Sequence, residues 1–161
     1  MTPDSMTLGL GIALIGASLT AFLGAVGSAW GIAIAAESAG GVLTEEPDKF
    51  GRVLVLLALP GTQGFYAFLG MFYVMLKINL LGGAIPINLG TGLQLCFAAL
   101  PVGVAGLFSG YFQGRASAAS ILLIAKRPEE MGKAVILPAM VETYAVLGLL
   151  ATILLVSGIK V

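Results

Sequence analysis

The chain alternates between long apolar runs and short polar segments, and this pattern predicts four membrane-spanning helices. Three runs, residues 5–36, 53–76 and 78–114, contain no Asp, Glu, Lys or Arg. A fourth run, residues 134–159, contains one charged residue, Glu142. Each run exceeds the about 20 residues that a helix needs to cross the hydrocarbon core of a bilayer. The expected fold class is therefore an all-α membrane protein with four transmembrane helices.

Two charged segments, residues 37–52 and 126–133, separate these runs. In both segments a proline with acidic neighbours precedes the next apolar run. Proline and acidic side chains are favoured in the first turn of a helix, so we expect Pro47 and Pro128 to stand at helix starts. The remaining connection, residues 79–88, is short, uncharged and glycine-rich.

The two halves of the chain read as a duplicated helical hairpin. Aligning Pro47 with Pro128 brings further pairs into register, namely Gly51 with Gly132, Arg52 with Lys133, and Thr62 with Thr143. We expect a first hairpin over residues 1–80 and a second over residues 81–161. At the same offset Glu142 falls opposite Gly61, so only the second hairpin has a carboxylate in its membrane span.

Small residues recur at every fourth position in the first and third predicted helices. These residues are Ala13, Ala17, Ala21, Ala25, Ala29 and Ala33 in the first helix, and Gly106, Gly110, Gly114 and Ala118 in the third. Small side chains let membrane helices approach closely. The spacing predicts a tightly packed inner layer of these two helices, although ordinary packing in any membrane bundle would give the same pattern.

Composition agrees with a membrane protein, because 58% of the residues are hydrophobic, 10% are charged and the mean hydropathy is +1.04. The formal net charge is zero, which gives no indication of a nucleic-acid partner. The sequence has no histidine, and we interpret its single cysteine, Cys96, as a small buried apolar residue. Residues 1–5 lack the basic region of a cleavable signal peptide, so we expect the first helix to be retained.

Basic residues are distributed unevenly between the two sides of the predicted membrane domain. The side with the charged segments has Lys49, Arg52, Arg115, Lys126, Arg127 and Lys133, whereas the other side has Lys77 and Lys160. Basic residues concentrate in cytoplasmic loops of membrane proteins. We therefore expect the charged segments in the cytoplasm and both termini outside.

Glu142 is the residue around which the chain must be explained. A charged side chain near the bilayer centre costs roughly 2.5 to 3.5 kcal/mol on insertion scales, and such residues are functional candidates. No Lys, Arg or His lies inside the four runs to pair with it. Glu142 must therefore be protonated, accept hydrogen bonds or bind a cation.

The second helix offers oxygen atoms that could join Glu142 at one site. Pro60 removes a backbone donor there and Gly61 loosens the helix further. Leu59, Thr62, Gln63 and Tyr66 follow the spacing of one helical face and present a carbonyl, a hydroxyl, an amide and a phenol.

The third helix adds Gln113, with Ser109 one turn earlier. A dehydrated hard cation needs several oxygen ligands and a negative charge, which these three helices could supply. Taken singly, Thr and Gln side chains in membrane helices often only link helices by hydrogen bonds.

Three segments, residues 59–66, 113–114 and 141–145, resemble the proteolipid of the rotor ring, called K or c, of bacterial V-type (V/A-type) ATPases. In the sodium-translocating members, the resemblance implies that Na+ is held by residues matching the Leu59 carbonyl, the Thr62 hydroxyl, the Gln63 and Gln113 side chains and the Glu142 carboxylate, with Tyr66 hydrogen-bonded to that carboxylate. Proton-translocating relatives need only the carboxyl group. Because both glutamines are present, the resemblance favours Na+ over H+ as the ion.

The same resemblance implies the partners and the role of the chain. Identical subunits form a ring in the lipid of the plasma membrane, and a stator subunit supplies an arginine to the empty carboxylate. The central stalk docks on the cytoplasmic segments 45–49 and 126–130, and ATP is hydrolysed on other subunits, so this chain is not an enzyme. The alternatives are the same rotor coupled to H+, or an oligomeric membrane channel that does not rotate.

Overall fold

The computed structural model describes residues 3–161, with side chains from residue 7 onward, and Met1 and Thr2 of the N-terminal segment lie outside the described residues. The elements in order are α1 (Pro3–Glu45), η1 (Pro47–Lys49), α2 (Phe50–Ala58), η2 (Leu59–Gly61), α3 (Thr62–Lys77), η3 (Leu80–Gly82), α4 (Leu89–Lys126), η4 (Pro128–Glu130) and α5 (Met131–Gly158), where η marks a 3-10 turn. Four stretches of the described chain are long and apolar enough to cross a membrane, which confirms the predicted all-α fold with four spans.

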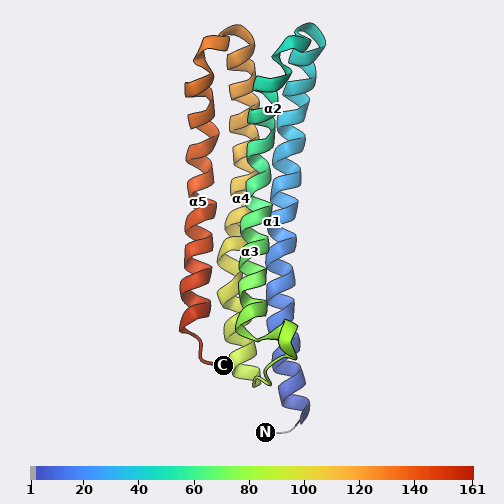
Figure 1. Ribbon diagram of the computed structural model, residues 1–161, viewed down its shortest axis with the longest axis vertical. Helices are drawn as coiled ribbons and strands as arrows, with labels where there is room; N and C mark the ends of the chain where they lie inside the picture. The colour runs from blue at the N-terminus through green and yellow to red at the C-terminus, as the bar shows by residue number, and fades with distance from the viewer. Residues whose placement is uncertain (1–2) are drawn as a thin grey trace.

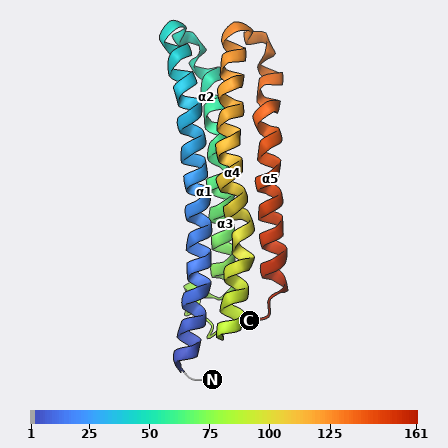
Figure 2. The ribbon, with the colours of Figure 1, turned by 180° about the vertical axis from the view of Figure 1, so that it is seen from behind.

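The helices stand side by side in an elongated bundle (Figure 1). The beginning of α1, the turn η3 and the end of α5 lie at one end, called here the termini end. The turns η1 and η4 lie at the opposite end, called here the polar-loop end. The helices α2 and α3 lie in front of α1 and α4 in Figure 1, and the view from behind in Figure 2 shows α1 and α4 in front.

The predicted close pairing of the first and third spans is present, and glycines make it. A Cβ built on Gly110 would lie 2.5 Å from the backbone of Gly27, and one built on Gly27 would lie 2.6 Å from the Cα of Leu107. Gly114 meets the backbone of Gly31 in the same way. Since real Cβ atoms do not approach other atoms so closely, α1 and α4 can pack at this distance only with glycine.

The alanine stripe of α1 does not form this interface along its whole length. Ala13 and Ala17 are buried, whereas Ala25, Ala29 and Ala33 are exposed. A step of four residues turns about 400° around a helix, so a stripe with this spacing drifts by about 40° per step. The alanines therefore rotate away from α4 in the middle of the span, where the glycines of α1 replace them.

The first charged segment, residues 37–52, is largely helical, although its polar residues suggested a connection between two helices. The helix α1 continues to Glu45, and only Glu46 separates it from η1. Ala39 and Val42, inside that segment, are buried in the apolar core of the polar-loop end, and this burial holds the extra turns in place. The two prolines take the expected positions, since Pro47 begins η1 before α2 and Pro128 begins η4 before α5.

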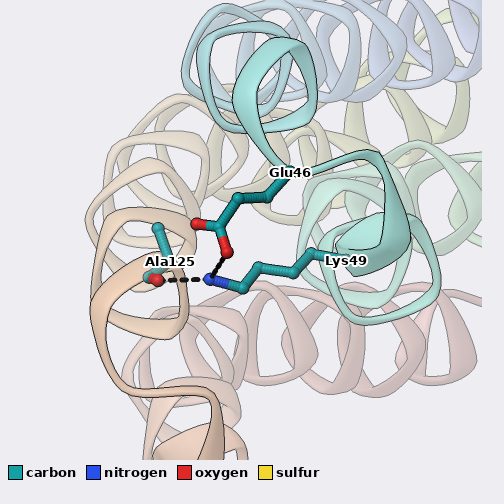
Figure 3. Close-up of polar contacts among 3 residues, drawn as sticks. All are labelled: Glu46, Lys49 and Ala125. Atoms are coloured by element: carbon teal, nitrogen blue, oxygen red, sulfur yellow. Dashed lines mark hydrogen bonds and ion pairs between the residues drawn. The ribbon is translucent and has the colours of Figure 1, made fainter.

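Lys49 fastens the first polar connection to the end of α4 (Figure 3). Its Nζ donates to the carbonyl of Ala125 in the last turn of α4 and forms an ion pair of 2.6 Å with Glu46. The last carbonyls of a helix have no partner within the helix. Lys49 therefore links the two hairpins at the polar-loop end.

Candidate functional site

The site begins at a break in the second span, where α2 ends and α3 starts. Pro60 has no backbone N–H, so one α-helical hydrogen bond is lost at this position. The chain forms the turn η2 instead, in which the Leu59 carbonyl accepts the backbone N–H of Thr62. The Thr62 hydroxyl donates to the same carbonyl at 3.0 Å. The break expected at Pro60 and Gly61 is present, and it presents Thr62 beside the Leu59 oxygen.

Ser28 of α1 holds this break in place from the neighbouring helix. Its Oγ donates to the Gly61 carbonyl at 3.1 Å and accepts the backbone N–H of Gly64 at 2.7 Å. Ser28 is 7% exposed, so these bonds are shielded. Gly61 is the position that the repeat sets opposite Glu142, and in the first hairpin its polar carbonyl is thus paired within the protein.

Glu142 of α5 is half-buried and reaches both α3 and α4. The Tyr66 hydroxyl of α3 donates to Glu142 Oε1 at 2.6 Å. Gln113 Nε2 of α4 donates to Glu142 Oε2 at a longer distance of 3.4 Å. The carboxylate is therefore held firmly on one oxygen and loosely on the other.

The side chains of Gln63 and Gln113 form the innermost part of the site. Both are fully buried, and Gln63 Nε2 donates to Gln113 Oε1. Gln63 Oε1 remains a buried acceptor without a hydrogen-bond partner among the described residues. Leaving such a group unpaired costs about 1–3 kcal/mol. A cation bound beside this oxygen would offset that cost.

No Lys or Arg pairs with Glu142 among the described side chains. The ion pairs found there, Lys49 with Glu46 and Lys133 with Glu130, lie at the polar-loop end. A carboxylate in an apolar span is stable only when it is protonated, hydrogen-bonded or bound to a cation. The oxygen-rich surroundings of Glu142 suit the hydrogen-bonded and the cation-bound forms.

Of the residues that the sequence singled out, hydrogen bonds join Gln63, Tyr66, Gln113 and Glu142 into one group. Leu59 and Thr62 are hydrogen-bonded to each other in the turn that precedes Gln63 and Tyr66. The side chains of the two residues that follow Glu142 in the sequence, Thr143 and Tyr144, are not hydrogen-bonded to this group among the described residues. The Thr143 hydroxyl donates back to the Met140 carbonyl at 2.7 Å, and Tyr144 is 67% exposed. Ser109 is buried, and its hydroxyl has no partner among the described residues.

Sequence reasoning missed Ser28, which positions the break from α1. A signal was available, because Ser28 is a hydroxyl in the middle of a run without charged residues. The alanine spacing of α1 gave no reason to consider it. Its role depends on contacts with residues more than thirty positions away, which a pattern along one helix does not reveal.

Comparison with known proteins finds the same family in both halves of the chain. The family of the ATP synthase C subunit matches residues 15–74 and again residues 96–155. Over 140 residues the chain is 42% identical to the V-type sodium ATPase subunit K of Enterococcus hirae, and this alignment covers 87% of this chain and 86% of that protein. Over 145 residues it is 34% identical to the A-type ATP synthase subunit K of Methanocaldococcus jannaschii, and this alignment covers 90% of this chain and 61% of that protein.

Proposed function

Because this chain belongs to the ATP synthase C-subunit family, we propose that it is the Na+-carrying rotor subunit of a V-type rotary ATPase and that Glu142 binds the ion. As a member of this proteolipid family it is a non-catalytic subunit. Its four candidate spans make it a multi-pass membrane protein. The similar protein of Enterococcus hirae is named a sodium ATPase subunit, and that name supports Na+ for this chain.

One observation carries the proposal: the carboxylate of Glu142 is joined through Gln113 to Gln63, whose buried Oε1 has no partner among the described residues. The negative charge and the unpaired acceptor both gain from a cation. Amide, hydroxyl and carbonyl oxygens are ligands that hard cations prefer.

Each group of the site has a part in carrying the ion. Glu142 supplies the charge that makes the occupied site neutral, which lowers the cost of facing lipid. Gln63, Gln113 and Thr62, together with the Leu59 carbonyl, supply oxygens that replace the water around Na+. Tyr66 holds the carboxylate in a fixed orientation through its 2.6 Å bond.

The site acts within a larger assembly in this proposal. Identical subunits form a ring, the arginine of a stator subunit stabilises the empty carboxylate, and the central stalk docks at the polar-loop end near residues 45–49 and 126–130. The polar-loop end lies in the cytoplasm, since most basic residues are there. The hairpins over residues 1–80 and 81–161 are the two repeats from which the chain is built.

Carbodiimide modification of Glu142 tests the ion. The carbodiimide first accepts the proton of the carboxyl group, whose oxygen then adds to the central carbon of the reagent, so an ion that displaces the proton slows the reaction. We expect Na+ to protect Glu142 at a fixed moderate pH, with K+ at the same concentration as the control. Equal rates in Na+ and K+ would contradict Na+ binding and favour the rotor coupled to H+.

The Glu142→Gln variant tests transport. This change keeps the size of the side chain and removes its charge, so we expect an assembled complex that hydrolyses ATP without accumulating Na+ in vesicles. Native mass spectrometry of the membrane complex checks that the oligomer still forms. Unchanged Na+ uptake by this variant would exclude Glu142 as the ion carrier and leave an oligomeric channel as the better account.

A further inference from the structure

A row of buried hydroxyl groups continues from Gln113 toward the polar-loop end of α4. Ser117 lies four residues after Gln113 and Ser120 three residues further, so the three share one helical face. Ser117 and Ser120 are fully buried. Neither hydroxyl has a hydrogen-bond partner among the described residues.

These two serines do not form the bond that a helical hydroxyl usually has within reach. A helical Ser or Thr can donate to a carbonyl three or four residues earlier. Exposed hydroxyls of this chain do so, namely Ser18, Thr44, Thr143 and Ser157. Burial makes an unpaired hydroxyl more costly, so the absence of this hydrogen bond at Ser117 and Ser120 requires an explanation.

Two buried threonine hydroxyls nearer the termini end, those of Thr20 and Thr152, are paired inside the protein. Thr20 Oγ1 donates to the Ala99 carbonyl at 2.9 Å, and Thr152 Oγ1 donates to the same oxygen at 3.3 Å. Ser109, one turn from Gln113 on that side, has no partner among the described residues but borders a groove of about 540 Å³ between α4 and α5. The fully buried, unpaired hydroxyls therefore lie on the polar-loop side of the site.

We propose that Ser117 and Ser120 bind ordered water molecules and extend the Gln63 and Gln113 site into a short water column. Buried polar groups without a protein partner are ordinarily hydrogen-bonded to ordered water. The helix rises about 6 Å from Gln113 to Ser117 and about 4.5 Å from Ser117 to Ser120. Two hydrogen bonds of about 2.8 Å through one water span at most about 5.6 Å, so one water can join Ser117 and Ser120, and the longer step from Gln113 needs a second water.

The column ends inside the protein. Ile121 and Ile124 follow Ser120 and belong to the apolar core of the polar-loop end, together with Ala39. The waters therefore hydrate the site from one side and do not form an open pore. This step rests on the proposed function: with water beside Ser117 and Ser120, Na+ can exchange its protein oxygens for water oxygens on the side of Gln113 that faces the cytoplasm.

Water-edited solid-state NMR of the assembled ring in liposomes tests the water binding directly. We expect magnetisation to pass from water protons to the Cβ atoms of Ser117 and Ser120 at short mixing times. Ile121, which is equally buried on the same helix, is the control and should receive little. Transfer to both serines no greater than to Ile121 would overturn the proposal. This readout does not depend on which ion the ring carries.

The double variant Ser117→Ala and Ser120→Ala gives a second test. If the hydroxyls bind water, removing them leaves the unfolding midpoint unchanged or lower, and Na+ exchange at Glu142 slows roughly fivefold per hydroxyl. If the hydroxyls are merely unpaired, the midpoint rises and exchange keeps its rate, which would overturn the proposal. Ser18→Ala, at an exposed hydroxyl bonded to its own helix, is the matched control.

Failure of this inference can be distinguished from failure of the proposed function. If the ring does not carry Na+, the unmodified protein shows no Na+ exchange at Glu142, while water transfer to Ser117 and Ser120 remains. If the column is absent, Na+ exchange at Glu142 has the same rate in the double variant as in the unmodified protein.

Discussion

Tyr66 and Glu142 meet across the two repeats of the chain, because the Tyr66 hydroxyl on α3 donates to Glu142 Oε1 on α5 at 2.6 Å. Gln63 of the first hairpin likewise donates to Gln113 of the second. The site therefore needs both hairpins, although only the second carries the carboxylate. This explains why Gly61 can stand opposite Glu142 in the repeat without the loss of a site.

Replacing Tyr66 with Phe should weaken ion retention. The change removes the shortest hydrogen bond to Glu142 and keeps the ring of the side chain. A hydrogen bond to a charged group is worth about 1.5–3 kcal/mol, so Na+ protection of Glu142 should weaken about tenfold or more. Titrating Na+ against the rate of carbodiimide modification measures the effect.

Tyr73→Phe is the matched control for that substitution. Tyr73 lies on the same helix and bonds to Ser157 at 2.7 Å in an exposed position near the termini end. Its loss should leave Na+ protection unchanged. Equal protection constants in Tyr66→Phe and the unmodified chain would show that the Tyr66 bond does not help to retain the ion.

Gln63→Leu should separate Na+ binding from protonation of the carboxyl group. The substitution removes the unpaired Oε1 and the donor to Gln113 while keeping a buried side chain of similar size. We expect Na+ protection to be lost while Glu142 still reacts with carbodiimide. The control is Gln94→Leu, at an exposed glutamine of α4. Undiminished Na+ protection in Gln63→Leu would leave the two glutamines with a packing role only.

The sequence was sufficient to predict the four spans, because apolar runs of this length with at most one charged residue leave the backbone no other stable form in a bilayer. The sequence also predicted Pro47 and Pro128 at helix starts, because proline lacks an N–H and this local property suits the first turn of a helix. The end of α1 could not be predicted in this way. Ala39 and Val42 continue the helix past Glu37 because they pack against residues of α2, α4 and α5, and such contacts are not visible in a linear pattern.

The candidate site shows the same division between local and distant information. Leu59, Thr62 and Tyr66 could be assigned to one face because helical spacing is local. The pairing of Tyr66 with Glu142 and the support from Ser28 depend on how helices pack, which helical spacing does not determine. The alanine stripe was misleading for a related reason, since its drift around α1 becomes visible only when the position of α4 is known.

Gly110→Ala should destabilise the bundle. The added Cβ would meet the backbone of Gly27 at 2.5 Å and that of Ser28 at 3.0 Å, so α1 and α4 must separate. Overpacking of this kind typically costs about 1–3 kcal/mol, and the thermal unfolding midpoint should fall. Gly40→Ala is the control, because a Cβ there meets nothing within 4 Å and alanine favours helix by about 1 kcal/mol. Equal midpoints for the two variants would contradict close glycine packing of α1 on α4.

Lys49→Met should loosen the end of α4. The variant keeps an apolar stem but removes the donor to the Ala125 carbonyl and the ion pair with Glu46 (Figure 3). A lysine at a helix C-terminus contributes about 0.3–1 kcal/mol, so amide hydrogen exchange in the last turn of α4 should accelerate severalfold while the spans stay protected. The control is Lys133→Met, which removes a similar ion pair whose lysine is 77% exposed and should therefore change little. Equal exchange rates at the end of α4 in both variants would show that Lys49 does not join the two hairpins.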